Sequence, residues 1–406
     1  MDDVNPDRSR VMRWRWLSDK VTLLLTCDTG LETLLLDEIS SLVDIDNYYM
    51  FPGRVFITIS NDRIANVFRS RIVNNIYLLL FISNNIDSLD KIYNVIRSID
   101  FSHTIYPHES FAIRSERIGQ HTFTSIDIAR VAGQAVIDSY MASRGVRLKV
   151  NLDNPDIEIY TELNNDRLLV GLALTRRSLH IRNRLFYHPA SLKSSIAAAM
   201  LRYAEWRPEI GIVDPMCGSG TIPIEAALIA KGVEVPCINI NAINIKVLER
   251  IHAEVVEHIK RLCRDRPNID VDRRYIGIDI NPKFVEGAII NAKNMGVDDI
   301  TLFISRNALE VIPIIKSIEH EFGVQIDLAI FNPPYGHRMK PGKLFDLYLK
   351  LLQILKDSNF RRAVFITSAI RVTQRVIDSI SDIVVNKIKI IHGTLPSYIY
   401  RIDFIN

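Results

Sequence analysis

The C-terminal half of the chain alternates strand-like and helix-like segments, and this alternation restricts the possible folds more than any other feature. Runs of β-branched and aromatic residues predict strands, and apolar residues at helical spacing predict the helices between them. The expected strands are 210–214, 274–279, 326–331 and 363–367, and the expected helices are 221–230, 282–295 and 345–355. Such alternation predicts a doubly wound α/β domain with a mainly parallel sheet.

The preceding part of the chain predicts smaller α+β units. Its strands are expected at 21–26, 54–60, 75–82, 111–114, 157–163 and 168–174, and its helices at 30–39, 62–70 and 126–140, the last capped by Thr124 or Ser125. A length of 406 residues, 48% of them apolar, provides material for two or three cores. We therefore predict domains at 1–80, 81–185 and 186–406.

Composition argues against several classes of protein. No uncharged apolar run approaches the ~18 residues of a membrane span, and the N-terminus lacks the layout of a secretory signal. The four cysteines, none in a C-x-x-C pair, are Cys27, Cys217, Cys237 and Cys263. This spacing argues against a zinc ribbon, an iron–sulfur cluster or a disulfide scaffold, and it indicates a reducing cytoplasm. We expect no metal site and no membrane partner.

A glycine-rich motif follows the first expected strand of the α/β domain. It reads Val213-Asp214-Pro215-Met216-Cys217-Gly218-Ser219-Gly220-Thr221 and lies where open α/β sheets bind ligands. Glycines let a ligand approach the backbone, and Asp214 leaves a carboxylate at the strand end. The motif is no phosphate loop, because no Lys-Ser/Thr pair follows, and it lacks the third glycine of a dinucleotide fingerprint.

An acid also ends the next expected strand, in Gly277-Ile278-Asp279-Ile280-Asn281. Such an acid typically binds a ribose diol, although it can instead cap the following helix. The usual separation from the glycine loop is about 20 residues, whereas positions 220 and 279 are 59 apart. Residues 231–273, with a helical stretch at 245–263, are therefore expected to be an insertion.

The most specific motif is Asn332-Pro333-Pro334-Tyr335-Gly336, directly after the strand 327–331. Two prolines fix φ and remove two backbone donors, which leaves a rigid loop rich in carbonyls. The Asn332 side-chain oxygen and the Pro333 carbonyl form a pair of acceptors suited to an –NH2 group. Tyr335 supplies a ring on which a planar base can stack.

Together these motifs resemble the class I S-adenosylmethionine-dependent methyltransferases that modify exocyclic amino groups. The resemblance implies a Rossmann-like domain, S-adenosylmethionine as cofactor, and a catalytic loop formed by Asn332, Pro333, Pro334 and Tyr335. The implied cofactor-binding residues are Pro189, Ala190, Asp214, Pro215, Cys217, Gly218, Gly220, Thr221, Asp279, Ile280, Asn307 and Ala308. Asn307-Ala308 departs from the Asp-Ala usual in the family, but Asn can still accept a hydrogen bond through its side-chain oxygen.

The earlier segments extend the resemblance. Residues 111–180, with Arg114–Ser125 and Asn154–Ile159, resemble a THUMP domain, and 21–39 resembles the ferredoxin-like domain that precedes it. The combination resembles THUMP-containing guanine-N2 methyltransferases, especially the tRNA (guanine(6)-N2)-methyltransferases, which carry N-P-P-Y. The resemblance implies that methyl transfer depends on positioning of the amine, without a covalent intermediate.

Basic residues form the expected RNA-binding surface. The stretch 167–204 holds cations and no acid, which the formal net charge of +3 conceals. The expected phosphate contacts are Arg114, Arg117, Arg144, Arg147, Arg176, Arg177, Arg182, Arg184, Arg338 and Lys340. We expect a tRNA partner and a monomer.

Several alternatives remain open at this point. N-P-P-Y is shared with DNA adenine-N6 and protein glutamine-N5 methyltransferases, although the THUMP-like segment argues against both. Guanine-N2 methylation of large-subunit rRNA, or of tRNA position 10, is a closer alternative. A catalytically silent RNA-binding module is the non-enzymatic one, and it predicts a damaged cofactor loop, whereas the loop is intact here.

Overall fold

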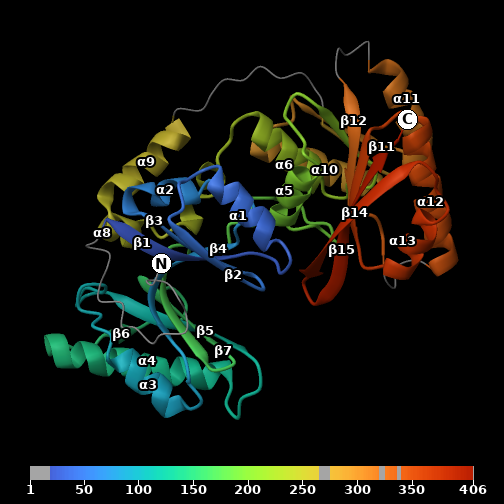
Figure 1. The fold of residues 1–406 in the computed structure, drawn as a ribbon. Coiled ribbons are helices and arrows are strands. Elements are labelled where there is room, and N and C mark those ends of the chain that lie inside the picture. Colours follow the sequence, from blue (N-terminus) through green and yellow to red (C-terminus); the bar gives the residue numbers. More distant parts are fainter. Residues whose placement is uncertain (1–18, 265–274, 320–324, 336–339, 406) are drawn as a thin grey trace.

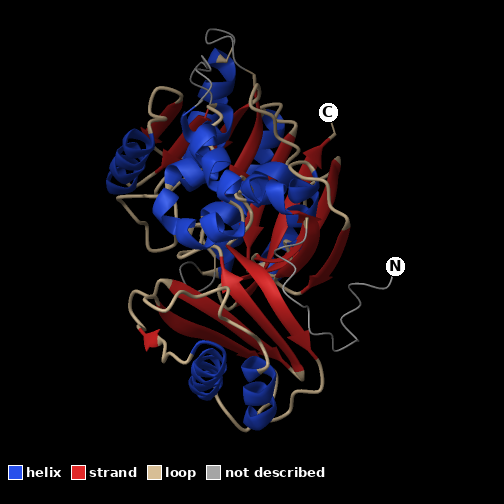
Figure 2. Cartoon of the chain, turned by 90° about the vertical axis from the view of Figure 1, so that its left-hand side faces the viewer, coloured by secondary structure: helices blue, strands red, loops and turns tan. Residues whose placement is uncertain are grey.

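Two large sheets, formed by the two halves of the chain, make up the fold (Figures 1 and 2). The computed structural model describes residues 19–264, 275–319, 325–335 and 340–405. One cluster of buried apolar side chains draws on both halves and includes Leu23, Leu168, Ile196 and Ala226. The two halves are therefore packed on a common core. No helix in the described ranges has both the length and the apolar character needed to cross a membrane.

The first sheet, as described, has eight strands in the order β2-β3-β1-β4-β8-β7-β5-β6. Their bounds are β1 Lys20–Thr26, β2 Asn47–Phe51, β3 Arg54–Ser60, β4 Asn75–Ser83, β5 Ser110–Ile118, β6 Lys149–Val150, β7 Ile157–Asn164 and β8 Arg167–Ala173. Pairing is antiparallel except that β5 runs parallel to β6 and β7. Because β4 pairs with both β1 and β8, the predicted boundary at residue 80 falls within a strand that joins the two N-terminal units.

Short helices cover this sheet. They are α1 Glu32–Ser40, the 3₁₀ turn η2 Asn61–Arg63, α2 Ile64–Val67, α3 Leu89–Arg97 and α4 Ser125–Arg144. Thr124, one of the two predicted caps, begins α4 with a capping box that includes Asp127. The pair α3 and α4 lies against the β5–β7 end of the sheet, in the lower part of Figure 1.

The second sheet has the doubly wound topology that the sequence predicts. Its described order is β11-β10-β9-β12-β13-β15-β14, with parallel pairing from β11 to β13. The elements are α5 Ser194–Tyr203, β9 Gly211–Asp214, α6 Thr221–Ala230, β10 Tyr275–Asp279, α10 Pro282–Met295, β11 Thr301–Ser305, α11 Ala308–Ile318, β12 Ile326–Phe331, α12 Pro341–Asp357, β13 Arg362–Thr367 and α13 Ile370–Ile377. The chain reverses its direction of winding at β9, so the carboxyl ends of β9 and β12 border a crevice.

An antiparallel hairpin completes the second sheet. Strands β14 (Ile383–His392) and β15 (Leu395–Phe404) pair along their full length, and β15 also pairs with β13. The hairpin reaches the N-terminal half, where the Ile391 N–H donates to the Thr29 carbonyl at 2.9 Å. Gly30 has φ +99°, and a Cβ there would lie 2.0 Å from the Lys389 carbonyl oxygen. Only glycine therefore permits this close approach.

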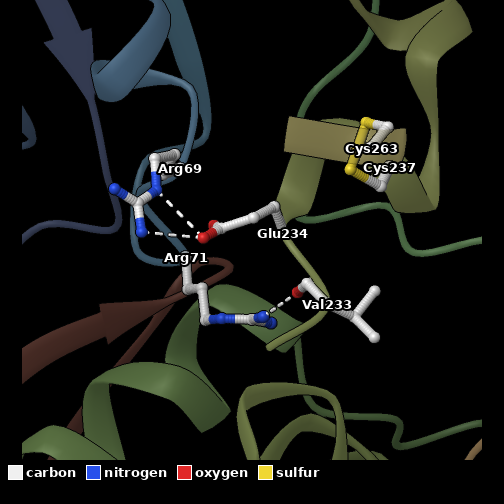
Figure 3. The surroundings of a disulfide bond; sticks show 6 residues. All are labelled: Arg69, Arg71, Val233, Glu234, Cys237 and Cys263. Atoms are coloured by element: carbon white, nitrogen blue, oxygen red, sulfur yellow. Dashed lines mark hydrogen bonds and ion pairs between the residues drawn. A yellow bond between two sulfur atoms is a disulfide. The ribbon is translucent and has the colours of Figure 1, made fainter. Parts of the chain in front are cut away.

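The expected insertion forms three described helices and a turn, α7 Val235–Ile238, η3 Ile240–Ala242, α8 Ile245–Ile251 and α9 Ala253–Arg264. Helix α9 packs beside α2 (Figure 1), and Arg69 forms an ion pair with Glu234 at 2.8 Å (Figure 3). Arg250 pairs with Glu109 at 2.6 Å. The insertion therefore connects the C-terminal domain to both N-terminal units.

A disulfide between Cys237 and Cys263 ties α7 to α9 within this insertion (Figure 3). This corrects the expectation of unpaired cysteines. The spacing of the two cysteines does not indicate a pair, because they come together only when α9 folds back on α7. Cys27 and Cys217 are free and buried, as small packing residues commonly are.

Candidate active site

A cavity of about 840 Å³ lies at the carboxyl ends of β9, β10 and β12. It brings together the catalytic loop and the predicted cofactor residues, with the exception of Gly220. The predicted residues that line it are Pro189, Ala190, Asp214, Pro215, Cys217, Gly218, Thr221, Asp279, Ile280, Asn307, Ala308, Asn332, Pro333, Pro334 and Tyr335. Segments up to about 145 residues apart in the chain therefore form one wall, because parallel strands present their carboxyl ends on the same edge.

Two hydrogen bonds, donated by backbone N–H groups of the glycine loop, attach this loop to β10. The Cys217 N–H donates to the Ile278 carbonyl at 2.9 Å, and the Gly218 N–H donates to Asp279 Oδ2 at 3.0 Å. Gly220 has φ +78°, and a Cβ there would lie 2.9 Å from the Phe303 ring. Gly220 thus shapes the start of α6 from behind, which explains why it does not line the cavity.

Asp214 is a buried carboxyl group in the cavity wall. It is 2% exposed, and its Oδ1 accepts the Met216 N–H at 3.1 Å. Burial, together with the nearby charge of Asp279, raises its pKa well above the ordinary aspartate range. A pair of carboxylates without a described cationic partner suits a cofactor that is itself positively charged.

Asn307 is already engaged by its own helix. Its Oδ1 accepts the Leu309 N–H at 3.2 Å as the cap of α11, and its Nδ2 donates to Glu310 at 3.1 Å. The residue still lines the cavity. Its predicted contact with the cofactor would use the second lone pair of that oxygen.

The catalytic loop presents an unfilled acceptor. Asn332 Nδ2 donates to the Ala190 carbonyl at 3.3 Å, which orients the amide, while the buried Oδ1 has no hydrogen-bond partner among the residues that the structure describes. The Tyr348 hydroxyl donates to the Pro334 carbonyl at 3.0 Å and supports the loop from below. A buried acceptor without a partner is costly, so this oxygen is suited to receive a donor from a ligand.

Several residues that line the cavity are not among those predicted from the sequence. His188 stacks edge-on against Phe284 and its Nδ1 accepts the Ala190 N–H at 3.0 Å. Ser368 follows β13, and His392 and Leu395 lie at the hairpin turn. His188 directly precedes Pro189 and Ala190, which the sequence predicts as cofactor-binding residues. The hairpin residues carry no local signal, because only the pairing of β15 with β13 and β14 places them at the cavity.

The predicted RNA-binding arginines divide into exposed and buried groups. The exposed ones are Arg114, Arg117, Arg144, Arg147, Arg176 and Arg177, to which Lys340 adds a charge beside the catalytic loop. Arg114 forms an ion pair with Glu158 at 3.0 Å, whereas Arg176 and Arg177 form no ion pair with any residue the structure describes. Arg338 lies outside the described residues.

Two members of the predicted set are corrected. Arg182 is 2% exposed and pairs with Glu225 at 3.1 Å, and Glu225 also binds Arg71 at 2.9 Å. Arg184 is half-buried and donates to the Thr221 hydroxyl at 2.6 Å. The prediction that Arg182 contacts phosphate is therefore wrong, and Arg184 points to the cavity wall. A basic run in sequence cannot distinguish an exposed guanidinium from one neutralised by a distant glutamate.

The residues present fit a sulfonium cofactor. The described residues contain no group of His, Cys, Asp or Glu side chains that could hold a metal ion. One part of the cavity suits the cofactor: it has the glycine loop, where a ligand can approach the backbone, and the acids Asp214 and Asp279. The other part, the N-P-P-Y loop, suits the methyl acceptor. This fold and site define a class I methyltransferase that uses S-adenosylmethionine.

Comparisons with known proteins agree with this class. Residues 182–396 match the RMKL-like methyltransferase domain, and residues 87–173 match the THUMP domain. The chain is 36% identical over 354 residues to a tRNA (guanine(6)-N2)-methyltransferase of Methanocaldococcus jannaschii, covering 84% of this chain and 89% of that protein. An Archaeoglobus fulgidus protein of the same name is 37% identical, covering 87% and 84%. The chain belongs to the tRNA (guanine(6)-N2)-methyltransferase family.

Solved structures share the fold. A possible methylase from Clostridium difficile 630 superposes with a TM-score of 0.80 at 21% identity, covering 95% of this chain and 99% of that one. A methyltransferase complexed with SAH has a TM-score of 0.79 at 20% identity, covering 96% and 99%. The predicted architecture, a Rossmann-like domain preceded by a THUMP domain, is thus confirmed.

Proposed function

We propose that the protein transfers the methyl group of S-adenosylmethionine to the exocyclic N2 amine of guanine 6 in the tRNA acceptor stem. The relatives at 36% and 37% identity support this substrate. The observation that carries the proposal is the buried Oδ1 of Asn332, a residue of the cavity wall, because this oxygen has no hydrogen-bond partner within the described part of the chain. An amine hydrogen would complete its hydrogen bonding.

The chain's own residues position the amine. The cofactor, when bound, supplies an electrophilic methyl group on a positive sulfonium, and Asp214, Gly218 and Asp279 would hold it. Asn332 Oδ1 and the Pro333 carbonyl accept the two amine hydrogens and turn the nitrogen lone pair toward that methyl. Positioning of this kind contributes up to roughly 7–11 kcal/mol. Because the sulfonium charge disappears during transfer, the amine proton can leave to solvent after the methyl has moved.

The tRNA is held by the exposed basic residues of both halves. Arg114, Arg117, Arg144 and Arg147 belong to the THUMP unit, and Arg176 and Arg177 follow β8 at the joint between the halves. Phosphate contacts of this type supply affinity and make it depend on salt. The target guanine leaves its stem at a cost of a few kcal/mol and stacks on Tyr335.

The protein is proposed to act as a monomer in the cytoplasm, without a metal. Disulfides are rare in a reducing cytoplasm, so the Cys237–Cys263 bond does not support this compartment, which rests on the proposed tRNA substrate.

The decisive experiment is mass-spectrometric mapping of methylguanosine after incubation of the protein with S-adenosylmethionine and unmodified tRNA transcripts. We expect N2-methylguanosine at position 6, and no product from a matched transcript with a compensated A–U pair there. Methylation at position 10 would contradict the proposed position. Methylation of large-subunit rRNA with tRNA unmodified would contradict the substrate.

A further inference from the structure

His392 lies at the point where the C-terminal hairpin meets the catalytic loop. It is the last residue of β14, and its Nδ1 lies 3.1 Å from the Tyr335 hydroxyl. Both side chains line the cavity, together with Leu395 at the start of β15. The Tyr335 ring is therefore held at its far end by a residue 57 positions away in the chain.

The imidazole is suited to accept this hydrogen bond. Burial lowers the pKa of His392, and although the charge of Asp28 opposes this, Lys193 acts in the same direction as burial. The ring is consequently neutral at physiological pH, and its Nδ1 can accept the Tyr335 hydroxyl proton. Tyr335 itself is half-buried, so its hydroxyl is partly shielded from competing water.

The N-terminal half supports His392 directly. The Ile391 N–H, one residue before the histidine, donates to the Thr29 carbonyl at 2.9 Å. Ile390 is buried in the core cluster shared by the two halves, and Gly30 packs without a side chain against Lys389. The position of His392 is thus set by the same unit whose sheet continues into the THUMP strands.

We propose that His392 is a positioning residue for methyl transfer, an inference that rests on the function proposed above. It fixes the Tyr335 ring over the target base by binding its hydroxyl from the β14–β15 hairpin. A tyrosine held only by its backbone could rotate about χ1 and χ2, and the base would then stack in several poses. Holding the hydroxyl restricts the ring to one pose, so the amine meets Asn332 in a single geometry.

The test is a double-mutant cycle with His392→Ala, Tyr335→Phe and the combined variant, measured as single-turnover methylation of tRNA. Each single substitution removes one hydrogen bond, and each should lower kcat about tenfold. The combined variant should be no slower than the slower single variant, because both changes remove the same interaction. Dissociation constants for S-adenosylmethionine should stay at the wild-type value.

His392→Asn is the matched control. Its side-chain oxygen replaces Nδ1 as an acceptor, so it should recover most of the lost kcat without changing KM for tRNA. Losses that multiply in the combined variant would overturn the proposal, as would a wild-type kcat for His392→Ala. Equal losses of cofactor affinity and of kcat in His392→Ala would also overturn it, since they would make His392 part of the cofactor pocket.

Discussion

At the scale of single residues, the active site depends on two buried polar groups that are incompletely satisfied. Asn332 Oδ1 is a buried acceptor without a partner among the described residues, and Asp214 places a carboxyl group in a desolvated wall. Both arrangements cost stability while no ligand is bound. In the proposed function, an amine would bind at the first and the cationic cofactor at the second.

Replacing Asn332 with Ala should lower kcat by about 10²–10³-fold, the usual effect of deleting a preorganised hydrogen-bonding group. Cofactor binding should be retained, because Asp214, Gly218 and Asp279, which would hold the cofactor, belong to β9, β10 and the glycine loop and not to the catalytic loop. Calorimetric titration with S-adenosylmethionine, alongside single-turnover methylation, measures both quantities. Full turnover by the variant would remove Asn332 from the catalytic role.

Replacing Asp214 with Asn should stabilise the protein and weaken cofactor binding. The pKa of Asp214 is raised in the folded state, so its ionisation costs stability as pH rises above the unfolded value of about 3.9. The melting temperature of Asp214→Asn should therefore equal that of the wild type below this pH and exceed it progressively at higher pH. A difference in melting temperature between variant and wild type that stays constant from pH 3 to pH 7 would contradict the raised pKa of Asp214.

At the scale of elements, the insertion works as a connector whose helices are tied by a disulfide. Replacing Cys237 and Cys263 with Ser should lower the stability of the α7–α9 region by up to about 3–4 kcal/mol, the loop-closure term for a separation of 26 residues. Hydrogen exchange of α7–α9 and thermal unfolding, each with and without reductant, give the measurement. Reductant should bring the wild type to the level of the variant and leave the variant unchanged.

At the scale of the whole molecule, a buried Arg–Glu–Arg cluster joins the halves. Glu225 of α6 accepts from Arg182 of the joint and from Arg71 of the N-terminal unit (Figure 3 shows Arg71). Burial opposes ionisation of Glu225, but the charges of Arg182 and Arg71 outweigh it and lower its pKa. The pairing is specific in geometry, so it selects one orientation of the RNA-binding units relative to the cavity.

Replacing Glu225 with Gln should destabilise the protein by about 3–5 kcal/mol, because two guanidinium groups stay buried without a counter-charge. Methylation of full-length tRNA should fall further than S-adenosylmethionine binding, since the halves lose their fixed orientation. The matched control is Glu205→Gln. Glu205 also binds two arginines, Arg362 and Arg401, but its side chain is 65% exposed, and both arginines keep Asp403 as a second partner. The loss should therefore be at most about 1 kcal/mol. Equal effects of both substitutions would contradict the role of the buried cluster.

Local chemistry accounts for what could be predicted from the sequence by itself. The alternation of strands and helices, the D-P-x-C-G-S-G-T loop and N-P-P-Y depend on neighbouring residues, and the parallel sheet then brings strand ends together by its topology. The cap at Thr124 was equally local. These features were enough to predict the fold, the cofactor and most of the cavity wall.

Only the tertiary structure decided the rest. Arg182 and Glu225 are separated by 43 positions, Cys237 and Cys263 by 26, and Tyr335 and His392 by 57. Nothing in the local sequence distinguishes a buried arginine from an exposed one. Nothing in it shows either that a histidine at a hairpin turn lies at the active site. Those roles arise from packing between distant segments, whose energies depend on burial and distance rather than on order along the chain.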